Sequence, residues 1–235
     1  MARFDGQRFA KLKVATWNVR GIAEKMEELQ TELLKRKIDI ASMTETKKKN
    51  KGSEDIGNYV MIYCGVPANQ WASSGVANAI RKDWKHKIQD YTWISYRIIE
   101  TRIKVLNRNF TIVGVYVPVE GKEQETEEFY RELQQSMDKI SKKESIILAG
   151  YCNGRIGNQP IPQCIGTYGE QVTNHNGAAL RDFCAFNKLK ITKSFYRHKD
   201  IYKFTWEARG TRSVIDYIII NDILKSNTAD TTVFR

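Results

Sequence analysis

A buried strand, an amphipathic helix and a second buried strand follow one another near the start of the chain, and this succession constrains the fold most. Residues 12–17 and 38–43 are apolar runs of strand length. Between them, residues 24–36 place Leu29 and Leu33 at helical spacing, so one face of the predicted helix is apolar. A helix of this kind connects two strands by packing across a sheet. The succession therefore predicts an α/β fold with a central sheet.

The rest of the chain adds strands and helices without an obvious interruption. β-Branched and aromatic runs predict strands at residues 59–63, 75–80, 94–105, 110–117, 145–149 and 214–220, with a turn at residues 107–109. Helical periodicity predicts helices at residues 125–140 and 178–187, and residues 150–176 are typical of a long loop. No linker rich in Pro, Gly or Ser divides the chain, so we expect residues 1–235 to form one domain.

The composition is that of a globular protein with an excess of positive charge. Lys and Arg number 38 against 27 Asp and Glu, which gives a formal net charge of +11. Such an excess permits a polyanionic partner such as nucleic acid, but a solvated lysine face produces it as well. No apolar run approaches the roughly 18 residues of a membrane span. The four cysteines form no CxxC pair, which argues against a zinc site and favours free thiols inside the cell.

Polar side chains stand where the predicted strands end. The positions are Asn18, Glu45, Tyr116, Asn153 and Asp216. Each of them alone is explained by a turn, by solvation of a strand end or by packing. If these strand ends lie at one edge of a sheet, the same side chains converge where ligand sites tend to form. The residues themselves leave both interpretations open.

The same positions resemble the motifs of a known family. Their order and surroundings are similar to those of the endonuclease/exonuclease/phosphatase superfamily, on the segments Trp17-Asn18, Glu45-Thr46, Tyr116 before Pro118, Gly150-x-x-Asn153 and Ile215-Asp216-Tyr217. The resemblance covers nearly the whole chain. It implies a four-layer α/β sandwich of the DNase I-like type and Mg²⁺-dependent cleavage of phosphodiesters.

The resemblance also implies a role for each position. It assigns metal binding to Glu45 and Asn18, and Glu45 suits this role because Mg²⁺ prefers oxygen ligands. Asn18, Asn153 and Tyr116 would contact the phosphate or orient the attacking water, since amides and hydroxyls donate hydrogen bonds without repelling an anion. Asp216 matches an aspartate that orients a catalytic histidine.

A closer resemblance is to the endonucleases of RTE-type LINE retrotransposons, above all those of BovB elements. It rests on the segments Asn153-Gly154-Arg155-Ile156-Gly157, Phe204-Thr205-Trp206-Glu207 and Ser213-Val214-Ile215-Asp216-Tyr217. This likeness implies DNA as the partner. A basic chain with reduced cysteines and a DNA partner is in turn expected inside the cell, in the nucleus. The same segments argue against inositol phosphates and sphingomyelin, on which other members of the superfamily act.

The sequence departs from the pattern of active members at two places. Tyr151 stands where those members have an aspartate that helps to activate water, and a phenol is neutral at pH 7. The chain also stops at Arg235, before the Ser-Asp-His turn of active members. We therefore expect a C-terminally incomplete domain that lacks the final turn and last strand, and a Mg²⁺ site that is weak or lost. Tyr151 is thus a catalytic-site position that has lost its acidic side chain. Both departures predict that phosphodiesterase activity is lost or strongly reduced.

A run of lysines follows Glu45 directly. Lys47, Lys48, Lys49 and Lys51 would flank the phosphate site and bind substrate, although a solvated loop has the same composition. The leading hypothesis is a retrotransposon-derived endonuclease-like domain that is retained for binding DNA or protein. One alternative is an active Mg²⁺-dependent enzyme that nicks DNA or cuts it at abasic sites. Another is a protein-interaction module unrelated to DNA.

Overall fold

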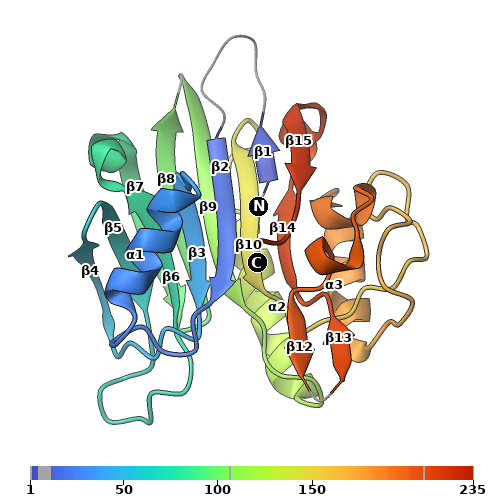
Figure 1. Ribbon diagram of the computed structural model, residues 1–235, viewed down its shortest axis with the longest axis horizontal. Coiled ribbons are helices and arrows are strands. Elements are labelled where there is room, and N and C mark those ends of the chain that lie inside the picture. Colours follow the sequence, from blue (N-terminus) through green and yellow to red (C-terminus); the bar gives the residue numbers. More distant parts are fainter. Residues whose placement is uncertain (1, 5–11, 106, 209, 235) are drawn as a thin grey trace.

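Two large sheets pack face to face in the structure, a computed structural model that describes residues 2–4, 12–105, 107–208 and 210–234 (Figure 1). The first sheet has seven strands in the order β15 (Thr228–Thr231), β1 (Ala2–Phe4), β2 (Leu12–Asn18), β3 (Ile40–Thr44), β6 (Val76–Arg81), β5 (Tyr59–Cys64) and β4 (Lys51–Ile56). The second has six in the order β11 (Lys190–Ile191), β14 (Asp216–Ile220), β10 (Ser145–Tyr151), β9 (Arg108–Tyr116), β8 (Ile98–Val105) and β7 (Ile88–Ser95). A separate hairpin pairs β12 (Trp206–Ala208) with β13 (Thr211–Ser213).

Helices connect the strands that run parallel. The α-helices are α1 (Met26–Lys35), α2 (Glu123–Met137) and α3 (His175–Phe186). The helix α1 joins the parallel strands β2 and β3, and α2 joins the parallel strands β9 and β10. The described residues also form four short 3₁₀ helices: η1 (Lys82–Lys87), η2 (Thr192–Phe195), η3 (Asp200–Tyr202) and η4 (Asp222–Asn227). None of the described helices is long and apolar enough to cross a membrane.

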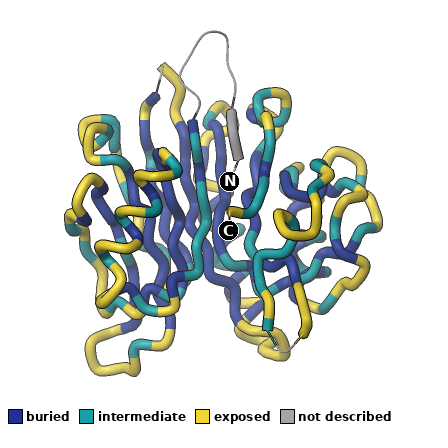
Figure 2. Tube along the Cα trace, viewed as in Figure 1, coloured by how far each residue is buried: buried dark blue, intermediate teal, exposed yellow. Residues whose placement is uncertain are grey.

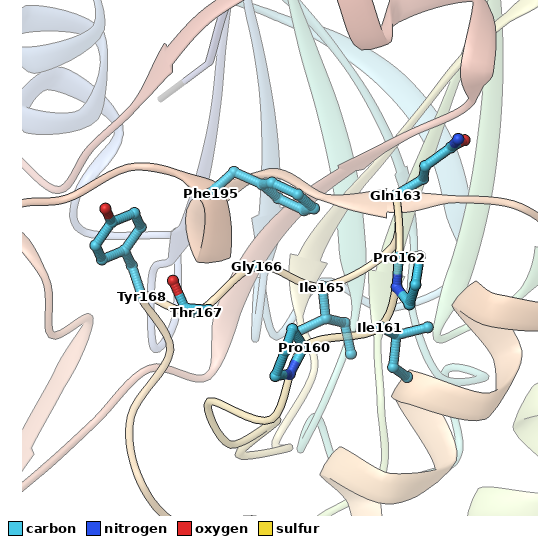
Figure 3. Close-up of a pocket in the computed structure, with 9 residues that line it drawn as sticks. All are labelled: Pro160, Ile161, Pro162, Gln163, Ile165, Gly166, Thr167, Tyr168 and Phe195. Carbon is cyan, nitrogen blue, oxygen red and sulfur yellow. The ribbon is translucent and has the colours of Figure 1, made fainter.

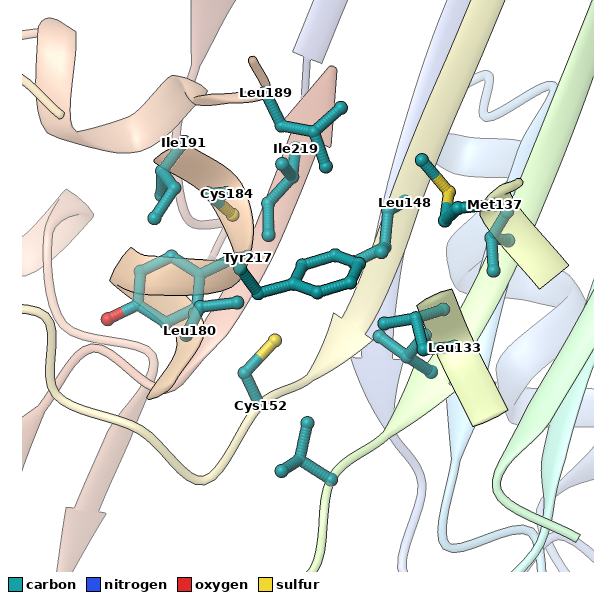
Figure 4. Packing of buried hydrophobic residues seen from close by; sticks show 14 of the residues in the cluster. Leu133, Met137, Leu148, Cys152, Leu180, Cys184, Leu189, Ile191, Tyr217 and Ile219 are labelled. Atoms are coloured by element: carbon teal, nitrogen blue, oxygen red, sulfur yellow. The ribbon is translucent and has the colours of Figure 1, made fainter. Parts of the chain in front are cut away.

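Three apolar clusters hold the layers together. Between the two sheets lie fully buried side chains of both, among them Val14, Ile40, Ile99, Ile112 and Ile147. A second cluster packs the apolar face of α1 on the outer face of the first sheet. The third packs α2 and α3 on the second sheet, where Figure 4 shows their side chains around the ring of Tyr217. The predicted four-layer α/β sandwich is therefore confirmed, and Figure 2 shows that its burial follows the strands.

The structure differs from the predicted elements mainly at polar strands. Residues 94–105 were expected as one strand, but they include the turn between β7 and β8. The edge strand β4 was not predicted, because its sequence Lys-Gly-Ser-Glu-Asp-Ile buries only Ile56. The helix α3 begins three residues earlier than expected, where the side chain of Asn174 accepts a hydrogen bond from Gly177 N at 2.9 Å. The short strands β1, β11, β12, β13 and β15 and most of β7 were not predicted either, whereas each predicted strand and helix has an observed counterpart close to its place.

Candidate active site

Strand ends bring the polar motif residues to one edge of the molecule. Asn18 ends β2, and Glu45 directly follows the end of the parallel neighbour β3. In the second sheet, Tyr116 and Tyr151 are paired at the ends of the parallel strands β9 and β10. Asp216 begins the antiparallel strand β14 opposite Tyr151. These strand ends lie along the lower edge of both sheets in Figure 1.

Asn18 and Glu45 form a direct contact. Asn18 Nδ2 donates a hydrogen bond to Glu45 Oε1 at 2.7 Å, while Asn18 Oδ1 accepts one from Arg20 N at 3.2 Å. Glu45 has a φ of +52°, a left-handed conformation that costs free energy in a residue other than glycine. Its carbonyl oxygen is held by Gly21 N at 2.7 Å. Backbone pairing between the two loops therefore fixes Glu45 in this conformation and aims its carboxylate at Asn18.

Tyr116 of the second sheet interacts with Glu45, which follows a strand of the first sheet. Burial, together with the neighbouring charge of Glu45, raises the pKa of Tyr116 to about 12, while Arg97 acts in the opposite direction. The Arg97 guanidinium lies 5.0 Å from the centroid of the Tyr116 ring and donates a hydrogen bond to the Tyr116 carbonyl oxygen at 3.4 Å. The Tyr116 hydroxyl is protonated at neutral pH and can donate a hydrogen bond to an anion. Arg97 is a residue that sequence reasoning missed, since no motif marks it.

Tyr151 lies among the acidic residues of the site. Its ring centroid is 6.0 Å from that of Tyr116, at an interplanar angle of 52°. Burial raises the pKa of Tyr151 far above its ordinary value, and the charges of Asp216 and Glu45 act in the same direction. The phenol is therefore neutral throughout the physiological range. At neutral pH it cannot take a proton from a water molecule as a carboxylate would.

Asp216 lies near enough to the buried Lys193 for their charges to interact. Burial raises the pKa of Asp216 to about 7, against the hydrogen bond of Thr205 and the charge of Lys193, which lower it. Lys193 is 6% exposed, and burial lowers its pKa to about 7. Its Nζ donates a hydrogen bond to Tyr202 O at 3.4 Å. No sequence signal distinguishes Lys193 from the other lysines, so only the fold reveals this pair. His198 lies 3.0 Å from Asp230 and does not serve as the partner of Asp216.

Asn153 is bound to neighbouring backbone. Its Nδ2 donates to Val117 O at 2.8 Å, and its own carbonyl oxygen accepts from Asn176 Nδ2 at 3.3 Å. Its φ of +49° is left-handed, which asparagine tolerates better than most residues. These contacts make Asn153 a turn residue that fixes the loop after β10. Its proposed contact with phosphate stays a prediction.

The four lysines after Glu45 have different surroundings. Lys48 is half-buried and pairs with Glu54 at 2.5 Å, so its charge is neutralised within the protein. Lys47, Lys49 and Lys51 are exposed. Lys51 Nζ lies 5.0 Å from the centroid of the Trp93 ring, and Lys49 Nζ donates to Ala68 O at 2.9 Å. Three of the four predicted substrate-binding lysines therefore present their charge to solvent.

The donor atoms at this edge fit a magnesium ion only in part. The described residues contain no group of three or more His, Cys, Asp or Glu side chains placed to hold a metal ion. Glu45 offers one oriented carboxylate, and Mg²⁺ often binds one or two carboxylates together with water and phosphate oxygens. Asn18 directs its amide nitrogen at Glu45, so in this arrangement it orients the carboxylate. Glu45 is thus the residue that fits the ion, and the place of Asn18 as a second ligand stays a prediction.

A pocket elsewhere does not involve the motif residues. It has a volume of about 450 Å³ and lies among prolines, isoleucines and aromatic rings of residues 160–168 and Phe195 (Figure 3). None of the predicted site residues lines it. The candidate site is therefore the open edge of the sheets and not an enclosed cavity.

Comparisons with known proteins relate the chain to one curated protein and to a set of nucleases. No protein-family model matches the chain. Craniofacial development protein 2 of Bos taurus is 28% identical over 218 residues, which cover 91% of this chain and 36% of that protein. The same protein of Tragulus javanicus is also 28% identical, and the match covers 38% of its length. The chain thus spans little more than a third of the curated relatives it matches.

Solved structures share the architecture at lower sequence identity. An AP endonuclease from Archaeoglobus fulgidus matches with a TM-score of 0.69 and 19% identity, over 93% of this chain and 90% of that one. The endonuclease domain of TRAS1, a telomere-specific non-LTR retrotransposon, matches with a TM-score of 0.59 and 16% identity, over 90% and 86%. At these identities the likeness shows the fold alone. The chain is therefore homologous to craniofacial development protein 2 and has the DNase I-like fold of the endonuclease/exonuclease/phosphatase proteins.

Proposed function

We propose that this chain is a retrotransposon-derived endonuclease-like domain that binds DNA and has lost most of its Mg²⁺-dependent phosphodiesterase activity. The observation that carries the proposal is the place of Tyr151. Its neutral phenol stands between Tyr116 and Asp216, where the resemblance to active nucleases calls for a charged aspartate. The chain keeps the surrounding residues and replaces the one that would activate water.

The proposed origin and location follow from several likenesses. The endonuclease domain of a non-LTR retrotransposon shares the fold, and the segments 153–157, 204–207 and 213–217 resemble RTE-type endonucleases of the BovB kind. A related structure is a 3′ phosphatase bound to a DNA hairpin product. These likenesses support DNA as the partner and, with it, a location in the nucleus. We further propose that residues 1–235 act as one domain.

Electrostatics support DNA binding at the site edge. The net charge is +11, and Lys47, Lys49 and Lys51 present exposed ammonium groups next to Glu45. Each phosphate that a lysine neutralises releases condensed counterions, so the logarithm of affinity falls with the logarithm of salt by about 0.9 per contact on duplex DNA. Replacing these three lysines by glutamine should therefore weaken binding and reduce the salt slope by about 2 to 3.

Fluorescence anisotropy with a labelled duplex between 50 and 200 mM salt, about the range over which such slopes are resolved, measures this effect. The matched control replaces the exposed lysines Lys139, Lys142 and Lys143 by glutamine. They lie before β10, at the opposite end from Tyr151, and the change in net charge is the same. Equal losses in both variants would contradict a DNA site at the Glu45 edge, because they would report net charge alone.

The retained residues can still orient a phosphate. Asn18 holds the Glu45 carboxylate, and the protonated hydroxyl of Tyr116 can donate to a phosphate oxygen. Mg²⁺ bound by Glu45 would neutralise phosphate charge and stabilise the leaving oxygen. In this proposal the Glu45 carboxylate is engaged by Asn18 and binds the metal ion, and the neutral Tyr151 supplies no base, so the general base of active members is missing. A missing general base costs about 10²–10⁴ in rate.

Plasmid nicking in the presence of Mg²⁺ tests the chemistry. Tyr151→Asp should raise the nicking rate by about 10² or more, and Tyr151→Phe, which adds no base, should leave it unchanged. Addition of EDTA, or Glu45→Ala in the Tyr151→Asp background, should abolish the gain and so exclude a contaminating nuclease. A folded Tyr151→Asp protein that nicks no faster than the wild type would contradict the assigned role.

The Asn18–Glu45 hydrogen bond and the nearby Tyr116 favour a second candidate, an active Mg²⁺-dependent enzyme that nicks DNA or cuts at abasic sites. The same experiment separates the two functions. If the wild type nicks plasmid or cleaves an abasic-site duplex, and Glu45→Ala abolishes this activity, the second candidate holds.

A further inference from the structure

Trp71 is exposed to an extent that its packing does not explain. It is 87% exposed, whereas Trp17, Trp84, Trp93 and Trp206 are all half-buried. A tryptophan in water forgoes the large apolar contact area that makes this residue stabilising in a core. Its neighbours along residues 67–70 are exposed as well. The side chain therefore does nothing for the fold and is available to a partner.

The loop that carries Trp71 is held firmly against the lysines. We call residues 65–75 the Trp71 loop and residues 46–51 the lysine segment. Near one end of the loop, Gly65 N donates to Asn50 O at 2.7 Å and Asn50 N donates to Val66 O at 2.8 Å. At the other end, Lys47 N donates to Ser74 O at 2.8 Å. Both ends of the Trp71 loop are thus bound to the lysine segment by backbone hydrogen bonds.

Further contacts shorten the free part of the loop. Asn50 Oδ1 accepts from Ala68 N at 3.1 Å, and Lys49 Nζ donates to Ala68 O at 2.9 Å. Within the loop, Gln70 N donates to Pro67 O at 2.9 Å. Trp71 therefore directly follows a short turn whose base is held by these contacts. The same lysine segment begins directly after Glu45, so the loop projects from the edge that carries the candidate active site (Figure 1).

Close packing leaves little room for the loop and the lysine segment to separate. A Cβ atom on Gly65 would lie 1.8 Å from the carbonyl oxygen of Lys48, and one on Gly75 would lie 2.5 Å from Thr46 Oγ1. Lys47 and Asn50 adopt left-handed φ angles of +54° and +58°, which place the exposed lysines beside the loop. Charge and aromatic surface are thus presented by two segments that are joined at both ends of the loop.

We propose that Trp71 is a stacking platform for an unpaired base of a nucleic acid whose backbone is bound by Lys47, Lys49 and Lys51. The proposal rests on the DNA binding proposed above and adds the class of substrate. An indole ring stacks on the face of a base, and lysines beside it take the phosphates that flank that base. In a continuous duplex both faces of each base are covered by neighbours. The favoured ligand is therefore DNA with a single-stranded stretch, a gap or a frayed end.

Binding to three labelled DNAs of equal length tests the proposal: a single strand, a continuous duplex and a duplex with a gap of several nucleotides. Trp71→Ala should weaken binding of the single strand and the gapped duplex by about tenfold or more, since stacking on one base has this value. Its affinity for the continuous duplex should change by less than about twofold. Trp71→Phe, which keeps an aromatic face, should restore most of the lost affinity. Phe186→Ala is the control, because Phe186 is 78% exposed and lies on α3, away from the lysine segment.

The outcomes separate this proposal from the proposed function. Wild type that binds all three DNAs with no effect of Trp71→Ala would overturn the stacking role and leave DNA binding intact. Equal weakening on all three DNAs would also overturn it, because the contribution of Trp71 to affinity would then not depend on unpaired bases. Wild type that binds none of the DNAs would overturn both proposals. Loss of binding to anionic lipid vesicles in Trp71→Ala, with unchanged DNA binding, would assign Trp71 to a membrane surface and overturn its role in stacking.

Discussion

The burial of the Lys193 ammonium group destabilises the folded protein, and replacement of Lys193 by methionine should remove this cost. The side chain is 6% exposed, and burial lowers its pKa from 10.5 to about 7, against the charges of Asp216 and Asp230, which raise it. The charge of Lys203 acts in the same direction as burial. Methionine keeps the length of the side chain and has no charge to bury.

The size and sign of the effect follow from proton binding. Between pH 7 and 10.5 the unfolded chain holds a proton on Lys193 that the folded chain has released, so stability rises with pH in this window. The rise is about 1.4 kcal/mol per pH unit, or at most about 5 kcal/mol over the window. Below pH 7 the full destabilisation remains. Lys193→Met should therefore be more stable than the wild type at pH 7, by about 2–4 kcal/mol, and the difference should shrink toward pH 10.

Urea denaturation of both proteins at pH 7, 8, 9 and 10 measures this difference. Cysteine and tyrosine groups titrate in both proteins, so their contributions cancel in the comparison. Lys199→Met is the control, since Lys199 is an exposed lysine of the same segment and should show no such dependence. If Lys193→Met follows the wild-type pH dependence in parallel, the ammonium group is solvated and the burial argument is wrong.

Further predictions concern Asp216, the buried thiols and the base of the Trp71 loop. The pKa of Asp216 is raised from 3.8 to about 7, so between these pH values the folded state binds more protons than the unfolded state. The free energy of unfolding therefore falls as the pH rises from 4 to 7. Asp216→Asn should flatten this fall, which urea denaturation at pH 4–7 measures. Cys152 and Cys184 are fully buried with raised pKa values, so a thiol reagent should modify them only as fast as the protein unfolds. Modification in seconds under native conditions would show that they are accessible. Gly65→Ala should loosen the Trp71 loop, because its Cβ would overlap the carbonyl oxygen of Lys48, and cleavage by a protease should increase within residues 65–75.

The sequence predicted the elements whose residues are buried on both faces. The strands β3, β9, β10 and β14 are apolar runs of this kind, while β2 is half-buried along most of its length but is apolar at its start. The edge strand β4 was missed because it has solvent on one side and alternates small or charged residues, which are also typical of loops. Its pairing with β5 depends on the neighbour and not on its own composition.

The same limit applies within the candidate site. Motif residues such as Glu45 and Tyr116 were found by their order along the chain, but their electrostatic partners were not. Arg97 reaches Tyr116 because β8 pairs with β9, and Lys193 approaches Asp216 because η2 packs on β14. A lysine in a run of sequence is most often solvated, so no local pattern marks one that is buried. Contacts between segments far apart in the sequence determine these electrostatic partners.

The position of Tyr151 suggests why the site tolerates a phenol. Asp216 lies directly opposite in the strand register, and Glu45 already raises the pKa of Asp216. A third carboxylate at this position would add repulsion between like charges that only a bound cation relieves. Tyr151→Asp should therefore lower the stability of the metal-free protein, and millimolar Mg²⁺ should recover part of that loss by binding the folded state. Thermal melting with and without Mg²⁺ measures both effects, with Tyr151→Phe as the uncharged control. If Tyr151→Asp melts with the wild type, and Mg²⁺ shifts neither, the acidic groups are too far apart to interact, and charge repulsion does not explain why the site tolerates a phenol.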